Sequence, residues 1–242
     1  MSVGATIRRG DQFDVVAFDA DDTLWHSEDG FRHAEETFVQ MIEPYAPEGV
    51  DVMAALTATE RANLPVYGYG VKAFTLSMVQ AALTISRDTV PPTVIGSLVD
   101  LGRSLLLEPV RLLDGVPEVL AEVGRTHRLI LITKGDLIHQ TRKVTTSGID
   151  HHFEHVEIVL EKDPETYDRV LRSLHLDPTR FCMVGNSVKS DILPVLTLGG
   201  HAVHVPYHLL WELEHVDHEH DHDVVELVSL RDLPAWLAAP LP

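Results

Sequence analysis

The sequence predicts an α/β protein with a doubly wound parallel sheet and an inserted α-helical domain. Three observations predict this fold: a short apolar strand near the start of the chain, a long stretch of helical periodicity directly after it, and a regular alternation of strands and helices in the remainder. Such alternation is typical of a parallel sheet that helices cover on both faces. We therefore expect an α/β core at residues 1–27 and 109–242, interrupted by a helical domain at residues 28–108.

The first predicted strand comprises residues 15–18, Val-Val-Ala-Phe. The run is too short for a helix, and an unbroken apolar run is typical of a strand that is buried on both faces of a parallel sheet. It ends in Asp19 and Asp21. In open α/β sheets, ligands bind just outside the carboxyl ends of the strands, so we expect both carboxylates to lie in a functional site.

The spacing of these two carboxylates suits catalysis with a metal ion. A carboxylate at Asp19 can attack an electrophile, while Asp21 can donate or accept a proton on the same side of the turn. Two carboxylates this close repel each other unless a cation lies between them. Magnesium prefers oxygen ligands and phosphate partners, so it suits this position better than zinc does.

The helical domain is predicted from apolar residues that recur at helical spacing from Glu28 onward. Three helices have a clear pattern, and a weaker pattern covers residues 50–63. Residues that break helices separate the four at 44–49, 65–70 and 88–92. The apolar positions that define the three clear helices are Phe31, Ala34, Phe38 and Met41, then Val71, Phe74, Met78 and Val79, then Val94, Leu98, Leu101 and Leu105.

After Asp114-Gly115 the chain alternates between strands and helices, and the connections are expected to be right-handed. The predicted strands are residues 128–132, 156–160, 181–184 and 202–205, and the predicted helices are residues 116–123, 137–146 and 164–174. Gly148 ends the second of these helices, and Asp163 and Pro164 suit the start of the third. With the first strand, this makes a sheet of five strands.

Polar residues with phosphate or metal chemistry follow three of these later strands. Thr133 and Lys134 follow the first, where a hydroxyl beside free backbone N–H groups that enter a helix is suited to phosphate. Lys162 follows the next strand. Asn186 and Asp191 follow the third, and amide and carboxylate oxygens are ligands for Mg²⁺.

The ordered set Asp19-x-Asp21-x-Thr23-Leu24, Thr133, Lys162 and Gly185-Asn186-Ser187 with Asp191 resembles the four motifs of the haloacid dehalogenase superfamily of aspartate-nucleophile hydrolases. The resemblance covers nearly the whole chain. It implies a Rossmann-like core, and it implies that the helical insertion at residues 28–108 is a cap that closes over the active site.

The resemblance also implies a role for each motif residue. Asp19 would be phosphorylated, and Asp21 would be the general acid and base; Thr133, Lys134 and Lys162 would bind phosphate. The expected ligands of Mg²⁺ are Asp19, the carbonyl of Asp21, Asn186 and Asp191. The family usually has Asp where this chain has Asn186, so the expected metal site carries one negative charge fewer and Asp191 becomes the more important carboxylate.

The predicted function is that of a magnesium-dependent phosphomonoester hydrolase that acts on a small phosphorylated metabolite through an aspartyl-phosphate intermediate. Dehalogenases proper lack the second Asp of the first motif, so Asp21 favours phosphoryl transfer. One alternative is a phosphomutase of the same superfamily, which would leave no net free phosphate. Another is a receiver-like phospho-signalling module, although receivers lack a long helical insertion. Candidate substrate contacts in the cap loop are Tyr67, Tyr69 and Lys72.

Composition limits the partners and the location. A formal net charge of −18 disfavours binding to nucleic acid and to anionic membrane surfaces. No apolar run reaches the ~20 residues that span a bilayer, and residues 1–14 lack a signal-peptide core, so a cytoplasmic location is expected. The single cysteine, Cys182, is expected to be a buried thiol. The His- and Asp-rich tract at 215–223 is predicted to be dispensable for catalysis, and no pattern indicates an oligomeric state.

Overall fold

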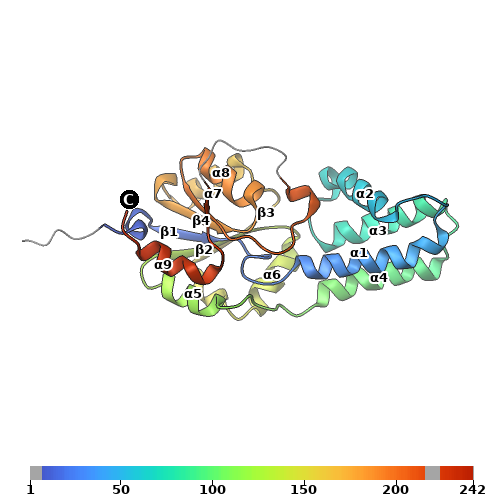
Figure 1. Cartoon of the computed structure of the whole chain (residues 1–242), viewed down its shortest axis with the longest axis horizontal. Coiled ribbons are helices and arrows are strands. Elements are labelled where there is room, and N and C mark those ends of the chain that lie inside the picture. Colours follow the sequence, from blue (N-terminus) through green and yellow to red (C-terminus); the bar gives the residue numbers. More distant parts are fainter. Residues whose placement is uncertain (1–6, 216–223, 242) are drawn as a thin grey trace, which may run out of the picture.

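The computed structural model describes residues 7–215 and 224–241 of the chain. Figure 1 shows an elongated molecule, with an α/β unit at one end and a helical unit, α1 to α4, at the other. None of the described helices is both long enough and apolar enough to cross a lipid bilayer.

The α/β unit is built on a parallel sheet, which confirms the predicted doubly wound fold. Within residues 7–215 and 224–241, its six strands lie in the order β3-β2-β1-β4-β5-β6, so β1 is central and the order reverses direction beside it. The strands are β1 (Val15–Phe18), β2 (Arg128–Lys134), β3 (His155–Val159), β4 (Phe181–Gly185), β5 (His201–His204) and β6 (Val225–Glu226). The prediction of five strands is wrong by one, because β6 has only two residues and so shows no periodicity in the sequence.

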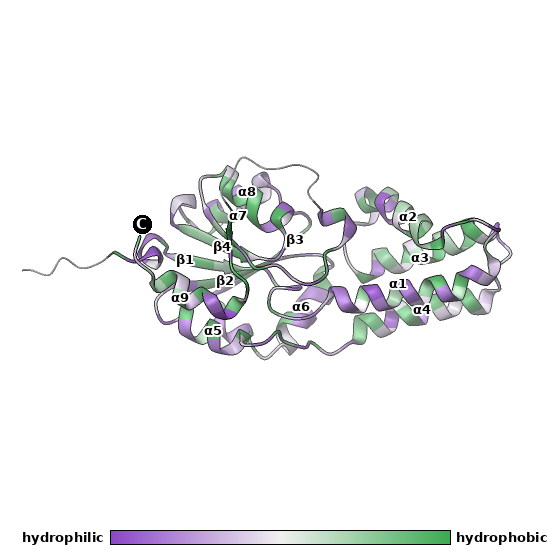
Figure 2. Cartoon of the chain, in the orientation of Figure 1, coloured by the Kyte–Doolittle hydropathy of each residue, from purple (hydrophilic) through white to green (hydrophobic). Residues whose placement is uncertain are grey.

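Helices cover both faces of this sheet. Along β1, Val16 and Phe18 face α5 (Val116–Val123) and α9 (Leu233–Ala238) in one apolar cluster, whereas Val15 and Ala17 belong to a second cluster with α7 (Pro164–Ser173) and α8 (Leu193–Thr197). The remaining helix, α6 (Leu137–Thr146), adds Val144 to the first cluster. Burial on both faces explains the unbroken apolar runs, and Figure 2 shows strongly apolar strands between helices of mixed hydropathy.

The helical unit has its own apolar core, which includes Phe38, Leu56 and Met78. It consists of α1 (Glu28–Ile42), α2 (Val52–Tyr67), α3 (Val71–Ser86) and α4 (Pro92–Leu107). The break expected at residues 65–70 is present but begins later than Pro65, since α2 continues to Tyr67 and the chain turns at Gly68, where φ is +70°. Pro65 lies in the last turn, where its missing N–H removes only one helical hydrogen bond.

Two chain segments join the units directly beside the end of β1. The backbone N–H of Leu113 donates to the carbonyl of Leu24 at 2.9 Å, so the outgoing and returning segments are hydrogen-bonded to each other. The Asp22 carboxylate accepts from the backbone N–H groups of Ser27 and Glu28, at 2.9 and 3.0 Å, and thereby caps the start of α1. The helical unit is therefore attached at the edge of the sheet where the first motif lies.

Candidate active site

The two units enclose a cavity of about 180 Å³ at the carboxyl ends of β1, β2 and β4. This edge is the switch point of the sheet, the usual ligand position in such folds. The lining includes the following residues predicted from the sequence: Asp19, Asp21, Tyr69, Thr133, Lys134, Lys162, Asn186 and Asp191. Four separate motifs thus meet in one cavity because each follows a parallel strand.

Asp19 is buried and directly paired with Lys162. Its Oδ1 accepts from the Lys162 ammonium at 2.5 Å, and its Oδ2 accepts from the Thr23 hydroxyl at 3.0 Å. Burial raises the pKa of Asp19 to about 7, and Lys162 acts in the opposite direction. Burial also tends to lower the pKa of Lys162, but the Asp19 and Asp191 carboxylates raise it well above its usual value. Lys162 is therefore the charged partner that favours an ionised Asp19.

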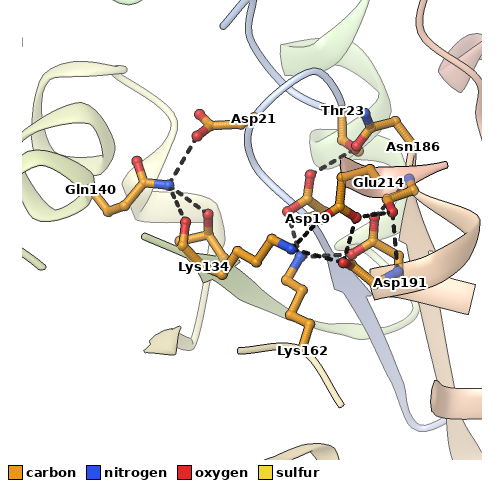
Figure 3. A network of polar contacts seen from close by, with 12 residues as sticks. Asp19, Asp21, Thr23, Lys134, Gln140, Lys162, Asn186, Asp191 and Glu214 are labelled. Atoms are coloured by element: carbon orange, nitrogen blue, oxygen red, sulfur yellow. Dashed lines mark hydrogen bonds and ion pairs between the residues drawn. The ribbon is translucent and has the colours of Figure 1, made fainter. Parts of the chain in front are cut away.

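Asp21 has a different environment, although only one residue separates it from Asp19. Figure 3 shows its carboxylate turned toward Gln140, which donates at 3.0 Å. The indole N–H of Trp25 and the ammonium of Lys143 also donate to it, each at 2.5 Å. Burial tends to raise the pKa of Asp21, but Lys143, Trp25 and Gln140 together hold it below its usual value. Three donors therefore hold this carboxylate in a fixed position, separate from Asp19.

The second motif places a hydroxyl and an ammonium group on the cavity wall. The Thr133 hydroxyl is buried and accepts from the Gln140 amide at 2.9 Å. The Lys134 ammonium donates to the Ser190 hydroxyl at 2.9 Å and to the Glu214 carboxylate, and it lies 4.1 Å from the centre of the Tyr69 ring. Lys134 thus reaches the cavity, with its charge already balanced by Glu214.

The fourth motif holds Lys162 from the other side. One oxygen of Asp191 accepts from Lys162 at 2.7 Å, and the other accepts from the backbone N–H of Ser187 at 3.0 Å. A Cβ atom on Gly185 would lie 2.3 Å from the Asp191 carboxylate. Glycine is therefore required at the end of β4 so that Asp191 can reach Lys162.

The oxygens around Asn186 fit a hard cation. With its nitrogen turned inward, the Asn186 amide donates to the Asp21 carbonyl at 3.2 Å, to the Thr23 hydroxyl at 3.2 Å and to Asp19 Oδ2 at 3.3 Å. In the opposite orientation the amide oxygen accepts from the Thr23 hydroxyl at 3.2 Å and faces the Asp21 carbonyl and Asp19 Oδ2, a set of oxygens that suits Mg²⁺. No group of three or more His, Cys, Asp or Glu side chains suited to a metal occurs at 7–215 or 224–241.

The loop between α2 and α3 brings only one of its three predicted contacts to the cavity. Tyr69 lines it and donates from its hydroxyl to Glu161 at 2.5 Å. Tyr67 is exposed on the last turn of α2, and Lys72 pairs with Asp136 at 2.9 Å; neither lines the cavity. The chain turns between Tyr67 and Tyr69 at Gly68, where φ is +70°.

Several lining residues carry no strong signal in the sequence. Gln140 and Lys143 lie one helical turn apart on α6, which directs both at Asp21. Their spacing after the second motif could have indicated a shared target. His139 lies beside them, and burial together with Lys143 lowers its pKa to about 4.

Glu214 comes from the segment after β5 and could not be found from the sequence. It is buried and accepts from the hydroxyls of Ser187 and Ser190 at 2.5 and 2.6 Å, in addition to its pair with Lys134. Burial tends to raise the pKa of Glu214, but Lys134 and the two serines hold it below its usual value. The tract after it, 216–223, lies outside the described residues, so its predicted dispensability stays a prediction.

Comparisons with known proteins agree with this geometry. A family model of haloacid dehalogenase-like hydrolases matches residues 13–195. A crystal structure of a haloacid dehalogenase-like family hydrolase from Xanthomonas campestris is 39% identical, with a TM-score of 0.83 over 93% of this chain and 90% of that one. A 2-haloacid dehalogenase from Pseudomonas syringae pv. tomato has a TM-score of 0.61 at 21% identity, over 93% and 98% of the two chains, which shows a shared fold.

One curated relative acts on a phosphate ester. A glyceraldehyde 3-phosphate phosphatase of Pyrococcus abyssi is 32% identical over 93 residues. The match spans 36% of this chain and 38% of that protein, so this chain matches less than half of the relative's length.

Proposed function

Because the chain belongs to the haloacid dehalogenase-like hydrolases, we propose that it is a magnesium-dependent phosphomonoester hydrolase that acts on a small phosphorylated metabolite through an aspartyl phosphate. The observation that carries this proposal is the second carboxylate, Asp21, which lines the same cavity as Asp19 and is held by its own three donors. Carbon–halogen cleavage has no need of that group. The relative from Pyrococcus abyssi, named as a phosphatase, supports the same chemistry.

The proposed roles follow from the contacts. Asp19 attacks phosphorus, and the phosphoryl group is bound by Thr133, Lys134 and Lys162 at the ends of β2 and β3. Asp21 gives a proton to the leaving alcohol and then takes one from the water that attacks the aspartyl phosphate.

The metal site would use Asp19, the Asp21 carbonyl, Asn186 and Asp191. Magnesium bound there would offset the negative charge of the phosphoryl group during transfer. The helical unit, residues 28–108, would act as the cap that separates this site from solvent, since one wall of the cavity comes from α1, α2 and α3.

The test is hydrolysis of p-nitrophenyl phosphate by the purified full chain, with magnesium and with excess chelator. We expect turnover with magnesium, its loss with chelator, and no turnover by Asp19→Asn. Unchanged turnover with chelator would exclude the metal assignment. Release of halide from a 2-haloacid without release of phosphate from any ester would overturn the phosphatase assignment, and a stable phosphoprotein without free phosphate would favour a receiver-like role.

A further inference from the structure

The cavity wall contributed by the helical unit is acidic. Three glutamates line it, Glu28 and Glu35 from α1 and Glu60 from α2. The helical unit lies entirely within the described part of the chain, and none of its Lys or Arg residues lines the cavity. The lysines of the lining, Lys134, Lys143 and Lys162, all come from the α/β unit. At the motifs, lysines and carboxylates line the cavity together, whereas the wall from the helical unit presents carboxyl groups without a lysine or arginine.

The sequence of α1 places its two glutamates on the same face. Glu28, Phe31 and Glu35 follow the spacing i, i+3, i+7, which repeats every two turns, about 10 Å along the axis. Glu28 is only 8% exposed and Glu35 only 7% exposed. Glutamate is rarely buried to this extent without a partner, so these two positions need an explanation.

Both buried glutamates have an oxygen without a hydrogen-bond donor. Glu28 Oε1 and Glu35 Oε2 have no hydrogen-bond partner among the described residues. Arg32 lies 3.2 Å from that oxygen of Glu35, close enough for charge attraction but not aligned to donate a hydrogen bond, and its own side chain is 42% exposed. A buried acceptor without a donor is unfavourable. Burial also raises the pKa of Glu28 and of Glu60 to about 8, so a cationic ligand would offset an existing penalty.

Aromatic rings also line this cavity, and the Tyr69 ring already lies 4.1 Å from the Lys134 ammonium. Phe31 and Phe74 meet edge to face with ring centres 5.4 Å apart, and Tyr69 and Trp211 do so at 5.9 Å. The negative face of an aromatic ring attracts organic cations, especially ammonium groups. Carboxylates together with aromatic rings form a surface that suits an organic ammonium group better than a sugar hydroxyl or a second phosphate.

We propose that the substrate is a phosphate monoester whose leaving alcohol carries an ammonium group, with the phosphate at Asp19 and Lys162 and the ammonium against Glu28, Glu35 and Glu60. This proposal rests on the proposed function. The reaction is the same hydrolysis: the ester P–O bond breaks, the amino alcohol leaves with a proton from Asp21, and water supplies the oxygen that ends on inorganic phosphate.

The test compares choline phosphate with 3,3-dimethylbutyl phosphate, in which a neutral carbon replaces the charged nitrogen. We expect kcat/KM to favour choline phosphate by about tenfold or more, the gain typical of one interaction with a buried charge. Glucosamine 6-phosphate and glucose 6-phosphate form a second pair with a primary ammonium group. A wild-type ratio near or below one in both pairs would overturn the proposal, while turnover of p-nitrophenyl phosphate in the same preparation would leave the phosphatase assignment intact.

The variants Glu28→Gln, Glu35→Gln and Glu60→Gln should lower the ratio of kcat/KM for the ammonium substrate to kcat/KM for its neutral analogue toward one. The ratio compares two substrates in one preparation, so it does not depend on the fraction of enzyme that folds. The matched control is Glu36→Gln, which removes the same charge from an exposed position of α1 and should keep the wild-type ratio. Equal loss in Glu36→Gln would mean that net charge, not this wall, sets the preference.

A binding measurement covers the case in which neither member of a pair turns over. Calorimetry of the wild-type chain with choline and with 3,3-dimethylbutanol needs no catalysis. Binding of choline about tenfold tighter or more supports the ammonium site. Equal affinity, or binding of neither alcohol, overturns it.

Discussion

At the scale of single residues, the main finding is that two neighbouring carboxylates have opposite surroundings. Asp19 is paired with Lys162 and Thr23, while Asp21 points away from it toward Gln140 and Lys143. Their pKa values shift in opposite directions, that of Asp19 upward through burial and that of Asp21 downward through its donors. The two carboxylates therefore occupy separate hydrogen-bonded environments although only one residue lies between them.

The two carboxylates should fail in different ways when changed to amides. Asp19→Asn removes the nucleophile, so no aspartyl phosphate should form. Asp21→Asn removes a proton carrier that typically contributes ~10² to 10⁴-fold to the rate. Because nitrophenolate leaves without being protonated, formation of the aspartyl phosphate should be affected less than its hydrolysis. Rapid-quench kinetics with p-nitrophenyl phosphate should show a burst and a trapped phosphoenzyme in Asp21→Asn only. If the phosphoenzyme accumulates in Asp19→Asn and not in Asp21→Asn, the roles of nucleophile and proton carrier are reversed.

Glu214 provides a second residue-scale prediction. Glu214→Gln removes the charge that pairs with Lys134, whose side chain is only 15% exposed, and weakens two bonds from serines. We expect the free energy of unfolding to fall by about 1.5–3 kcal/mol in urea titrations. The control is Glu212→Gln on the same turn, which breaks an exposed pair with Arg61 and should cost about 0–1 kcal/mol. Equal losses in the two variants would contradict a structural role for Glu214.

At the scale of elements, the close packing of α3 on α4 depends on one glycine. A Cβ atom on Gly102 would lie 2.0 Å from the hydroxyl oxygen and 2.9 Å from the Cβ of Thr75 on α3. That hydroxyl already donates to the Val71 carbonyl at 2.7 Å, so Thr75 cannot move aside without losing this bond. Gly102 is therefore the contact that sets the distance between these two helices.

Two glycines of α4 should respond in opposite ways to alanine. Gly102→Ala should lower the free energy of unfolding by about 1–3 kcal/mol through overpacking against Thr75. Gly96→Ala should raise it by about 0.5–1 kcal/mol, because nothing lies within 4 Å of the new Cβ and alanine favours the helix. Urea titration measures both, and a stabilising Gly102→Ala would show that the helices can separate at no cost.

At the scale of the whole molecule, the distribution of charge matters more than its sum. A chain with a net charge of −18 repels phosphate over long distances, yet three lysines face the cavity. The opposite wall concentrates carboxyl groups in a buried position, where ionisation is unfavourable. Stability should therefore depend on pH through these groups.

Glu28 gives this dependence a definite sign. Its pKa is raised from 4.5 to about 8 in the folded chain, first by burial and then by neighbouring carboxylates. The folded state thus keeps a proton that the unfolded state releases. The resulting stabilisation is complete below pH 4.5 and is lost as the pH rises through about 8. Thermal melting should show that wild type loses more stability over this range than Glu28→Gln, which cannot titrate. Parallel melting curves for the two proteins would contradict this, and the exposed Glu36→Gln should behave like wild type.

The sequence alone predicted the doubly wound sheet, five of its strands and the meeting of four motifs. Carboxyl ends of parallel strands lie on one edge of a sheet whatever the connections are, so Asp19, Thr133, Lys162 and Asp191 could be placed together from their order along the chain. Their catalytic roles and the two-domain division stay predictions. The strand β6 was missed, because a strand of two residues is too short to show an alternation of apolar and polar residues.

Only the tertiary structure decided which residues from distant elements complete the cavity. Glu214 reaches Lys134 across 80 positions of sequence, and the glutamates of α1 and α2 line the same cavity as the motifs only because the helical unit packs at the carboxyl ends of the strands. The same packing separates Tyr69 from Tyr67, two residues that a sequence cannot distinguish. Local patterns determine strands and their ends, whereas the direction in which a side chain faces across an interface depends on the packing of whole elements.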